Sequence, residues 1–315
     1  MIHFLEKPMR FAHALRPLAA ALVLAALLPA HASAVGEKGF AFLKLGVGAR
    51  AMGMGGAYVA EATDPTAVYW NPAGLAGLPS TQITFMHNEW IQDFRQDFAC
   101  VATPAFRGGR GGAALGVSTF YSSEFEQRDD TGLLTGHFGF NDILATGSAA
   151  FPLAEGLSAG LSAKYIREMI DQMDATSVAF DAGALYRVPR TSLSLGGALQ
   201  NVGTDAKFIT ESFGLPTTVR LGAAYGIGVP AWGSQARLSA EFHKASGEDS
   251  RMQLGGEFLY HKVVAIRAGL KLGYDEEKVA FGLGLNRDRF SFDYALVPLT
   301  ADLGTTHFFS LTARL

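Results

Sequence analysis

Few residues of this sequence have types and spacings that could carry catalytic or metal-binding chemistry. The single cysteine, Cys100, allows neither an intrachain disulfide nor a cysteine-based zinc site. The eight histidines stand at no spacing typical of metal ligands, and the sequence contains neither HExxH nor a nucleophile elbow. We therefore predict a protein that is not an enzyme and that has no metal site and no cofactor.

A glycine-rich stretch near the N-terminus imitates a dinucleotide-binding motif. Gly46-Val-Gly-Ala-Arg-Ala51 comes after an apolar run, and an acidic residue, Asp64, lies further along the chain. Such a motif needs alternating strands and helices around it. The residues after this stretch are again rich in glycine and then show one strand pattern after another, so we interpret the stretch as structural.

Two acidic clusters, Asp129-Asp130 and Asp275-Glu276-Glu277, fall in predicted connections between strands. Solvated loop charges are the simpler interpretation. A Ca²⁺ ion, or a cation bridging lipopolysaccharide, is the alternative, since carboxylate oxygens are the ligands such ions prefer.

The N-terminus has the three parts of a secretory signal peptide. Basic residues come first, Leu18 to Leu28 form an apolar run, and Ala32-Ser33-Ala34 supplies the small residues of a cleavage site. The apolar run is shorter than the roughly 20 residues that a spanning helix needs. We predict that residues 1–34 are removed and that the mature chain is exported.

The composition excludes one class of partner and favours a membrane environment. Of the 315 residues, 49% are hydrophobic and only 17% are charged, and the formal net charge of -3 gives no signature of nucleic-acid binding. Glycine (37 residues) and phenylalanine (23 residues) are unusually frequent for a soluble enzyme. We therefore expect contact with lipid and none with nucleic acid.

Hydrophobic and small or polar residues alternate along most of the chain, which is the pattern of β-strands. From Leu157 to Tyr165, for example, apolar residues alternate with serine, glycine and lysine. The pattern predicts about fourteen strands at 81–90, 96–106, 112–122, 140–152, 156–168, 176–187, 191–202, 217–229, 234–244, 251–260, 263–273, 278–286, 289–298 and 306–315.

The length and spacing of these strands favour a transmembrane barrel over a soluble sandwich. Tilted strands that cross a bilayer need about 9–11 residues, and the predicted strands reach that length. Short connections alternate with longer ones such as 123–139 and 203–216. Bacterial outer-membrane barrels have this alternation and an even number of strands. We predict an all-β, up-and-down antiparallel transmembrane barrel in the outer membrane, formed by residues 81–315.

One face of these strands carries charges that would be costly in lipid. A charge facing the middle of a bilayer costs about 2–4 kcal/mol. We therefore predict that the charged face lines the lumen, with charges at Lys164, Arg220, Glu257, Arg267, Lys271, Asp293 and Arg314.

Residues 35–80 do not alternate and are too apolar for a periplasmic tail. Because wall side chains cannot fill a lumen of about fourteen strands, we predict that this segment folds inside it as a plug. It ends near Asn71-Pro72-Ala73, where proline lacks an N–H for a strand ladder and disfavours a helical conformation at the residue before it. These three residues are our candidate hinge between plug and wall, or gate lining.

The mature N-terminus resembles the start of PorV/PorQ-family outer-membrane proteins and, more widely, the FadL-like superfamily. The resemblance lies in Leu43 to Ala60, in Asp64-Pro65 and in Tyr69 to Leu75, and it extends to Asp293-Tyr294-Ala295 and Phe309-Ser310-Leu311 near the C-terminus. It implies a fourteen-stranded barrel with a plug-like N-terminal region. The chain ends in Leu315, whereas the assembly signal of such barrels usually ends in an aromatic residue.

The two branches of the resemblance imply different functions. The PorV branch implies a part in a type IX-like protein export system, with secretion-machinery proteins or secreted cargo as partners. The FadL branch implies a channel for hydrophobic small molecules, with Asn71-Pro72-Ala73 near a lateral opening. We rank the secretion role first, the hydrophobic channel as its alternative, and a general porin last because the predicted plug would block the lumen.

Overall fold

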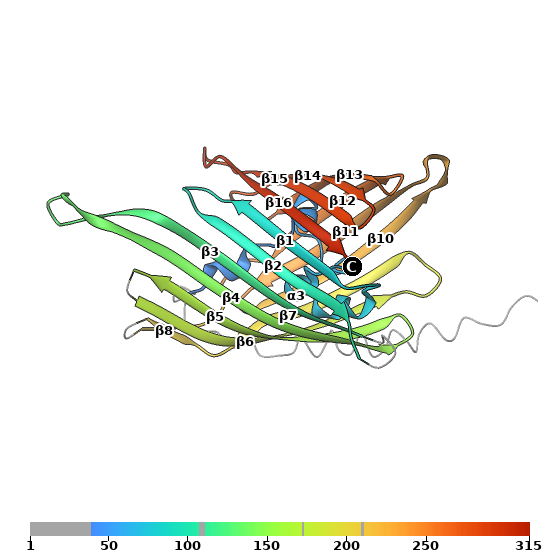
Figure 1. Ribbon diagram of the computed structural model, residues 1–315, viewed down its shortest axis with the longest axis horizontal. Helices are drawn as coiled ribbons and strands as arrows, with labels where there is room; N and C mark the ends of the chain where they lie inside the picture. The colour runs from blue at the N-terminus through green and yellow to red at the C-terminus, as the bar shows by residue number, and fades with distance from the viewer. Residues whose placement is uncertain (1–38, 107–110, 172, 209–210) are drawn as a thin grey trace, which may run out of the picture. The chain divides into compact units, whose positions relative to one another are not determined.

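The computed structural model describes residues 39–106, 111–171, 173–208 and 211–315, and these form a closed barrel with a segment inside it (Figure 1). Fourteen antiparallel strands make the wall, and β1 closes the ring by pairing with β16. The strands are β1 (Gln82–Glu89), β2 (Arg95–Pro104), β3 (Gly112–Arg128), β4 (Leu134–Ala154), β5 (Leu157–Ile170), β6 (Met173–Arg187), β7 (Leu193–Gly203), β10 (Thr218–Val229), β11 (Ser234–Ala245), β12 (Arg251–Tyr260), β13 (Val264–Leu272), β14 (Val279–Arg287), β15 (Phe290–Pro298) and β16 (Thr305–Arg314).

The predicted fold class, an antiparallel barrel of fourteen strands, is confirmed, but two predicted loops contain strands. Residues 123–139 were expected to be a loop, whereas β3 and β4 continue through much of it up to the pair Arg128 and Leu134. The rings of Phe125 and Phe138 stack at 5.3 Å and support this extension. The connection between β7 and β10 holds a small hairpin of β8 (Ala206–Phe208) and β9 (Glu211–Phe213). The predicted signal peptide lies outside the described residues.

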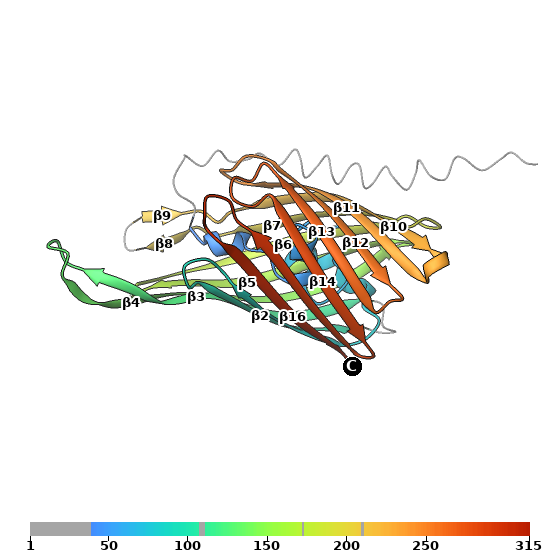
Figure 2. The ribbon, with the colours of Figure 1, turned by 90° about the horizontal axis from the view of Figure 1, so that it is seen from above.

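The two ends of the barrel differ in their connections. At one end, here called the turn end, short connections join β4 to β5, β12 to β13 and β14 to β15, and the C-terminus lies there too. The other end, called the loop end, carries the β3–β4 extension and the β8–β9 hairpin (Figure 2).

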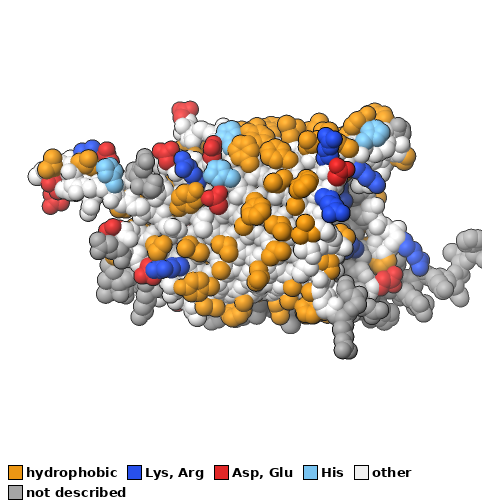
Figure 3. Space-filling view, viewed as in Figure 1, with side chains coloured by type: hydrophobic (Ala, Val, Ile, Leu, Met, Phe, Trp, Pro, Cys, Tyr) orange, Lys and Arg blue, Asp and Glu red, His pale blue; other side chains and the backbone are white. Residues whose placement is uncertain are grey.

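The two faces of the wall differ in polarity. Large apolar side chains are exposed on the outer face of strands around the barrel, among them Leu115, Leu161, Phe180, Leu283 and Phe292. Figure 3 shows them spread over the middle of one side, with charged side chains at the two ends. The inner face carries many small or polar side chains, together with buried large apolar ones such as Phe98, Leu144 and Ile166. Within the described residues, no helix is long and apolar enough to cross a membrane.

Residues 39–80, called the inner segment, lie within the ring of strands in both views (Figures 1 and 2). They form η1 (Ala41–Lys44), α2 (Ala49–Gly53), α3 (Ala67–Trp70) and η2 (Pro72–Gly77). α2 packs on β13 to β16, and η2 packs on β2 to β6. The elements are short because the segment repeatedly bends to follow the wall.

Glycines of the wall allow the inner segment to approach so closely. A Cβ on Gly196 of β7 would lie 2.3 Å from the carbonyl oxygen of Val59, and one on Gly269 of β13 would lie 2.2 Å from the nitrogen of Gly55. Similar conflicts would arise at Gly112, Gly160, Gly183 and Gly255. A side chain at Gly183 would collide with the side chain of Asn71, and one at the other positions would push the two backbones apart.

Replacing a contact glycine should therefore destabilise the protein. We expect Gly196→Ala to lower the free energy of unfolding by about 1–3 kcal/mol, which is the usual effect of overpacking. The control is Gly147→Ala, because a Cβ there meets nothing closer than 3.5 Å. The measurement is the temperature at which the folded, heat-modifiable gel band disappears. Equal transition temperatures for the two variants would show that the contact is dispensable.

Candidate functional site

Asn71, the first residue of the predicted hinge, links the inner segment to the wall. It is fully buried, and its Oδ1 accepts a hydrogen bond from the N–H of Ala73 (3.1 Å), which caps η2. Its Nδ2 donates to the carbonyl oxygen of Val59 in the inner segment (2.8 Å) and to that of Ala184 in β6 (3.0 Å). One amide side chain thus joins η2, the inner segment and the wall.

Pro72 and Ala73 start η2, where the missing N–H of proline is no loss. A Cβ on Gly160 of β5 would lie 2.4 Å from the carbonyl carbon of Pro72, so the turn rests directly on the wall backbone. The hydroxyl of Ser158, on the same strand, donates to the carbonyl oxygen of Ala73 (3.0 Å). The three residues therefore lie at the turn end, packed against β5 and β6.

Aromatic residues before Asn71 form the interior of the inner segment. Trp70 packs edge-on against Tyr58 and Tyr69, and its indole N–H donates to the carbonyl oxygen of Val47 (2.8 Å). Burial raises the pKa of Tyr69 to about 12 and that of Tyr58 well above its ordinary value. Both phenols therefore stay neutral donors, that of Tyr69 to the carbonyl oxygen of Leu43 and that of Tyr58 to Asp64.

Three of the predicted lumen charges form a chain of ion pairs with the inner segment, here called the charge ladder. Arg50 of α2 pairs with Glu257 of β12 (2.9 Å). Glu257 also pairs with Arg267 of β13 (2.7 Å), which in turn pairs with Asp293 of β15 (2.8 Å). A second link joins Arg237 of β11 to Glu61 of the inner segment (2.7 Å).

The other predicted lumen charges have separate partners. Lys164 pairs with Asp181 (2.6 Å), and the guanidinium of Arg314 donates to the hydroxyl of Ser291 (2.7 Å). Lys271 pairs with Glu277 in the β13–β14 loop.

Arg220 pairs with Glu241 (2.7 Å) and lies 4.9 Å from the ring of Trp70. Glu241 accepts the backbone N–H groups of Tyr58 and Val59, each at 2.8 Å. Sequence reasoning missed Glu241. The crowding of Arg237, Glu241 and His243 on one face of its strand was the available signal.

The inner segment divides the described lumen into two unlike halves. Toward the loop end, an apolar cavity of about 10 Å³ lies between the inner segment and β2 to β5, lined by Phe42, Leu45, Val47, Val68, Phe98 and Leu144 among others. Toward the turn end, a polar vestibule of about 440 Å³ lies beside the charge ladder, with Arg50, Glu257 and Arg267 in its lining.

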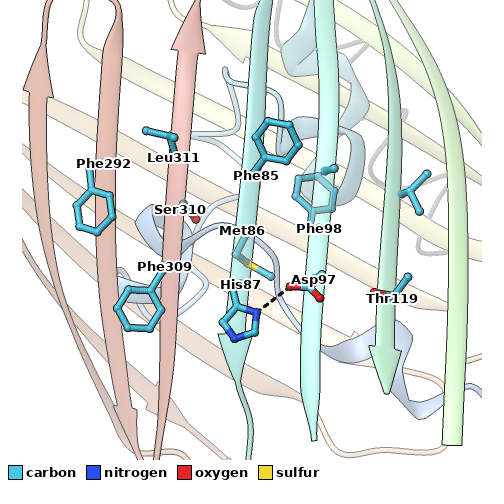
Figure 4. A pocket seen from close by; sticks show the side chains of 12 residues that line it. Phe85, Met86, His87, Asp97, Phe98, Thr119, Phe292, Phe309, Ser310 and Leu311 are labelled. Atoms are coloured by element: carbon cyan, nitrogen blue, oxygen red, sulfur yellow. Dashed lines mark hydrogen bonds and ion pairs between the residues drawn. The ribbon is translucent and has the colours of Figure 1, made fainter. Parts of the chain in front are cut away.

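An apolar groove of about 500 Å³ lies on the outer face where β15, β16, β1, β2 and β3 meet. Figure 4 shows Phe85, Phe292, Phe309 and Leu311 around it, and His87 paired with Asp97 (2.7 Å) at its edge. Phe98 lines both this groove and the internal cavity. The strand ladder is continuous there, since Phe98 pairs with Met86 and with Ser118 in unbroken register.

The fold is similar to that of solved FadL-like outer-membrane barrels. The Ralstonia pickettii toluene transporter TbuX matches with a TM-score of 0.61 at 15% identity, over 86% of this chain and 98% of TbuX. A Pseudomonas aeruginosa FadL homologue matches with a TM-score of 0.54 at 14% identity, over 85% and 97%. The Pseudomonas putida toluene transporter TodX matches with a TM-score of 0.54 at 12% identity, over 85% and 96%.

Residues 19–183 match the Uncharacterised protein family UPF0164, and the chain belongs to this family. No curated protein sequence matches the chain. At identities of 15% or lower the structural likeness shows the fold alone. Assignment to the PorV/PorQ branch stays a prediction.

The role of Asn71 can be tested with Cys100 as a reporter. The Cys100 thiol is buried and donates to the carbonyl oxygen of Pro65 in the inner segment (3.3 Å). Asn71→Asp would place a carboxylate against the two carbonyl oxygens that now accept hydrogen bonds from the Asn71 amide. A buried polar group without its hydrogen-bond partner lowers the free energy of unfolding by about 1–3 kcal/mol or more.

We expect Asn71→Asp to lower the unfolding temperature and to make Cys100 react faster with a maleimide. Asp130→Asn, the reverse change in an exposed loop, is the control. Unchanged labelling in Asn71→Asp would contradict the assignment of Asn71 as a link that holds the inner segment.

Proposed function

We propose that the protein is an outer-membrane channel for hydrophobic small molecules. The observation that carries this proposal is a set of apolar side chains in the loop half of the lumen, which line a small cavity together with polar residues such as Gln96 and Lys164. A general porin has a water-filled, polar lumen, whereas here Phe42, Phe98 and Leu144 enclose a cavity. The related fold of two proteins described as toluene transporters supports the same function.

A buried apolar cluster lies between the loop end and this cavity. Phe40, Phe42, Leu43 and Leu144 belong to this cluster, which also includes Ala206 of the β8–β9 hairpin. Phe42 and Leu144 reach from this cluster into the cavity lining. We propose that a ligand enters through this cluster and that Phe98 is the last barrier before the outer groove.

The cavity as it stands is too small for a ligand, so passage requires movement. In this proposal the inner segment acts as the plug, Asn71, Pro72 and Ala73 are the hinge at its turn end, and residues 1–34 direct export. The secretion role stays a prediction that co-purification with export proteins would test. We place it second because the apolar cavity has no part in it.

The channel can be tested by uptake of radiolabelled toluene into cells whose only barrel of this kind is the present one. We expect uptake to exceed that of cells lacking the protein. Phe98→Gln should reduce it about tenfold, because a polar group in the path raises the free energy of an apolar ligand there by about 1–3 kcal/mol. Phe290→Gln, the same change on the outer face, is the control. Equal uptake with and without the protein would exclude this function.

The plug should open from its loop side. η1 is held by apolar contacts and by the partly exposed pair of Lys44 and Glu248, whereas α2 is held by the buried charge ladder. Segments with fewer buried contacts open at lower free energy. We expect amide hydrogens of η1 to exchange at least about tenfold faster than those of α2. Simultaneous exchange of the two would show that the segment moves as one unit.

A further inference from the structure

Two acidic side chains face each other across β4 and β5 near the loop end of the lumen. Asp142 and Glu168 are directly opposite in the strand register, and only 1% and 8% of their surfaces are exposed. Residues in such positions have Cβ atoms about 4.5–5.5 Å apart. Two buried carboxylates at that separation repel each other, so both can be ionised only if a positive charge lies between or beside them.

The described part of the chain supplies no such charge. Glu168 accepts the backbone N–H of Phe40 (3.0 Å), and neither oxygen of Asp142 accepts a hydrogen bond from any described residue. Lys164, on the same face of β5, pairs with Asp181, and Lys44 of η1 pairs with Glu248. The acids of the charge ladder, in contrast, each have an arginine partner.

Aromatic rings border this pair. Phe120 of β3 is opposite Asp142, and Phe140 precedes Asp142 on the same face of β4. Phe94 stacks on Phe120 with ring centroids 5.0 Å apart and meets Phe140 edge-on at 5.7 Å. Phe40, whose N–H donates to Glu168, is fully buried.

We propose that Asp142 and Glu168 bind the ammonium group of an organic amine with an apolar body. An ammonium group donates three hydrogen bonds, which the free oxygens of the pair can accept, and aromatic faces attract the cation. The apolar body would lie against the surrounding phenylalanines. A divalent metal ion fits poorly, because it needs about six oxygen ligands and most of the neighbours are aromatic carbons. The proposal rests on the proposed channel and adds hydrophobic amines to its ligands.

The test compares two ligands of the same shape, 2-phenylethylamine and propylbenzene, by calorimetric titration of the detergent-purified protein. We expect the amine to bind at least about tenfold more tightly, as charge-assisted hydrogen bonds are the stronger kind. Asp142→Asn and Glu168→Gln should each abolish this difference without changing the affinity for propylbenzene. Asp130→Asn, in an exposed loop, should leave both affinities unchanged.

Heat-modifiable gel migration shows whether each variant is folded. If Asp142→Asn does not fold, Glu168→Gln alone tests the role of the acidic pair. Lys38, two positions before Phe40 in the sequence, is the chain's own source of an ammonium group and lies outside the described residues. Lys38→Gln therefore serves as a control for competition by a lysine of the chain itself.

Equal affinities for amine and hydrocarbon in the wild type, in Lys38→Gln and in both acid variants would overturn the proposal. Failure of the channel itself looks different. In that case propylbenzene would neither bind to the protein nor pass through it, whether or not the amine binds.

Discussion

Direct contact between two backbones, that of the inner segment and that of the barrel wall, is the constraint on which this structure depends. The wall meets the segment at Gly160, Gly196 and Gly269, where a Cβ would come within 2.4 Å or less of the segment's main chain. Strand interiors normally avoid glycine, because it packs nothing and costs conformational entropy. Here the segment occupies the space that side chains at these positions would fill. The high glycine content of the chain thus reflects a lumen filled by backbone rather than by side chains.

This contact also explains why the lumen is charged. A segment pressed against the wall loses water around its N–H and C=O groups, and each buried group then needs a partner. Wall side chains provide several of them: Glu241 accepts hydrogen bonds from two N–H groups of the segment, and the hydroxyl of Ser310 accepts one from the N–H of Ala49 (2.9 Å). Asn71, within the segment itself, donates to the carbonyl oxygen of Val59. Arg220 balances the charge of Glu241. Some lumen charges, among them Glu241 and Glu257, therefore fix the position of the segment, whereas Lys164, Lys271 and Arg314 have partners outside it.

The sequence predicts the wall better than the lumen, and the reason is physical. Alternation with period two reports which face of a strand is apolar, so strands and the barrel can be derived from local pattern alone. It cannot report which residues of neighbouring strands are opposite. Glu257, Arg267 and Asp293 can be assigned to one face from sequence, but their link to Arg50 depends on how a non-alternating segment folds inside the ring. The opposition of Asp142 and Glu168 likewise depends on register, which no local pattern shows.

The two halves of the lumen hold the inner segment by different forces, and the difference matters for an apolar ligand. Toward the turn end, Arg50 of α2 pairs with the buried Glu257, which also keeps a pair with Arg267 within the wall. The pair of Lys44 and Glu248 is 31% and 21% exposed, and pairs near the surface are worth about 1 kcal/mol or less. η1 is held further by the burial of Phe42 and Leu43 and by two hydrogen bonds, from the N–H of Phe40 to Glu168 and from the hydroxyl of Tyr69 to the carbonyl oxygen of Leu43. A hydrophobic ligand that displaces η1 would bury the apolar surface of the wall that the side chains of η1 had covered. Much of the hydrophobic stabilisation lost by moving η1 would therefore be regained. A polar solute offers no such return, so in the proposed channel a seal that yields to a hydrocarbon would stay closed to a polar solute.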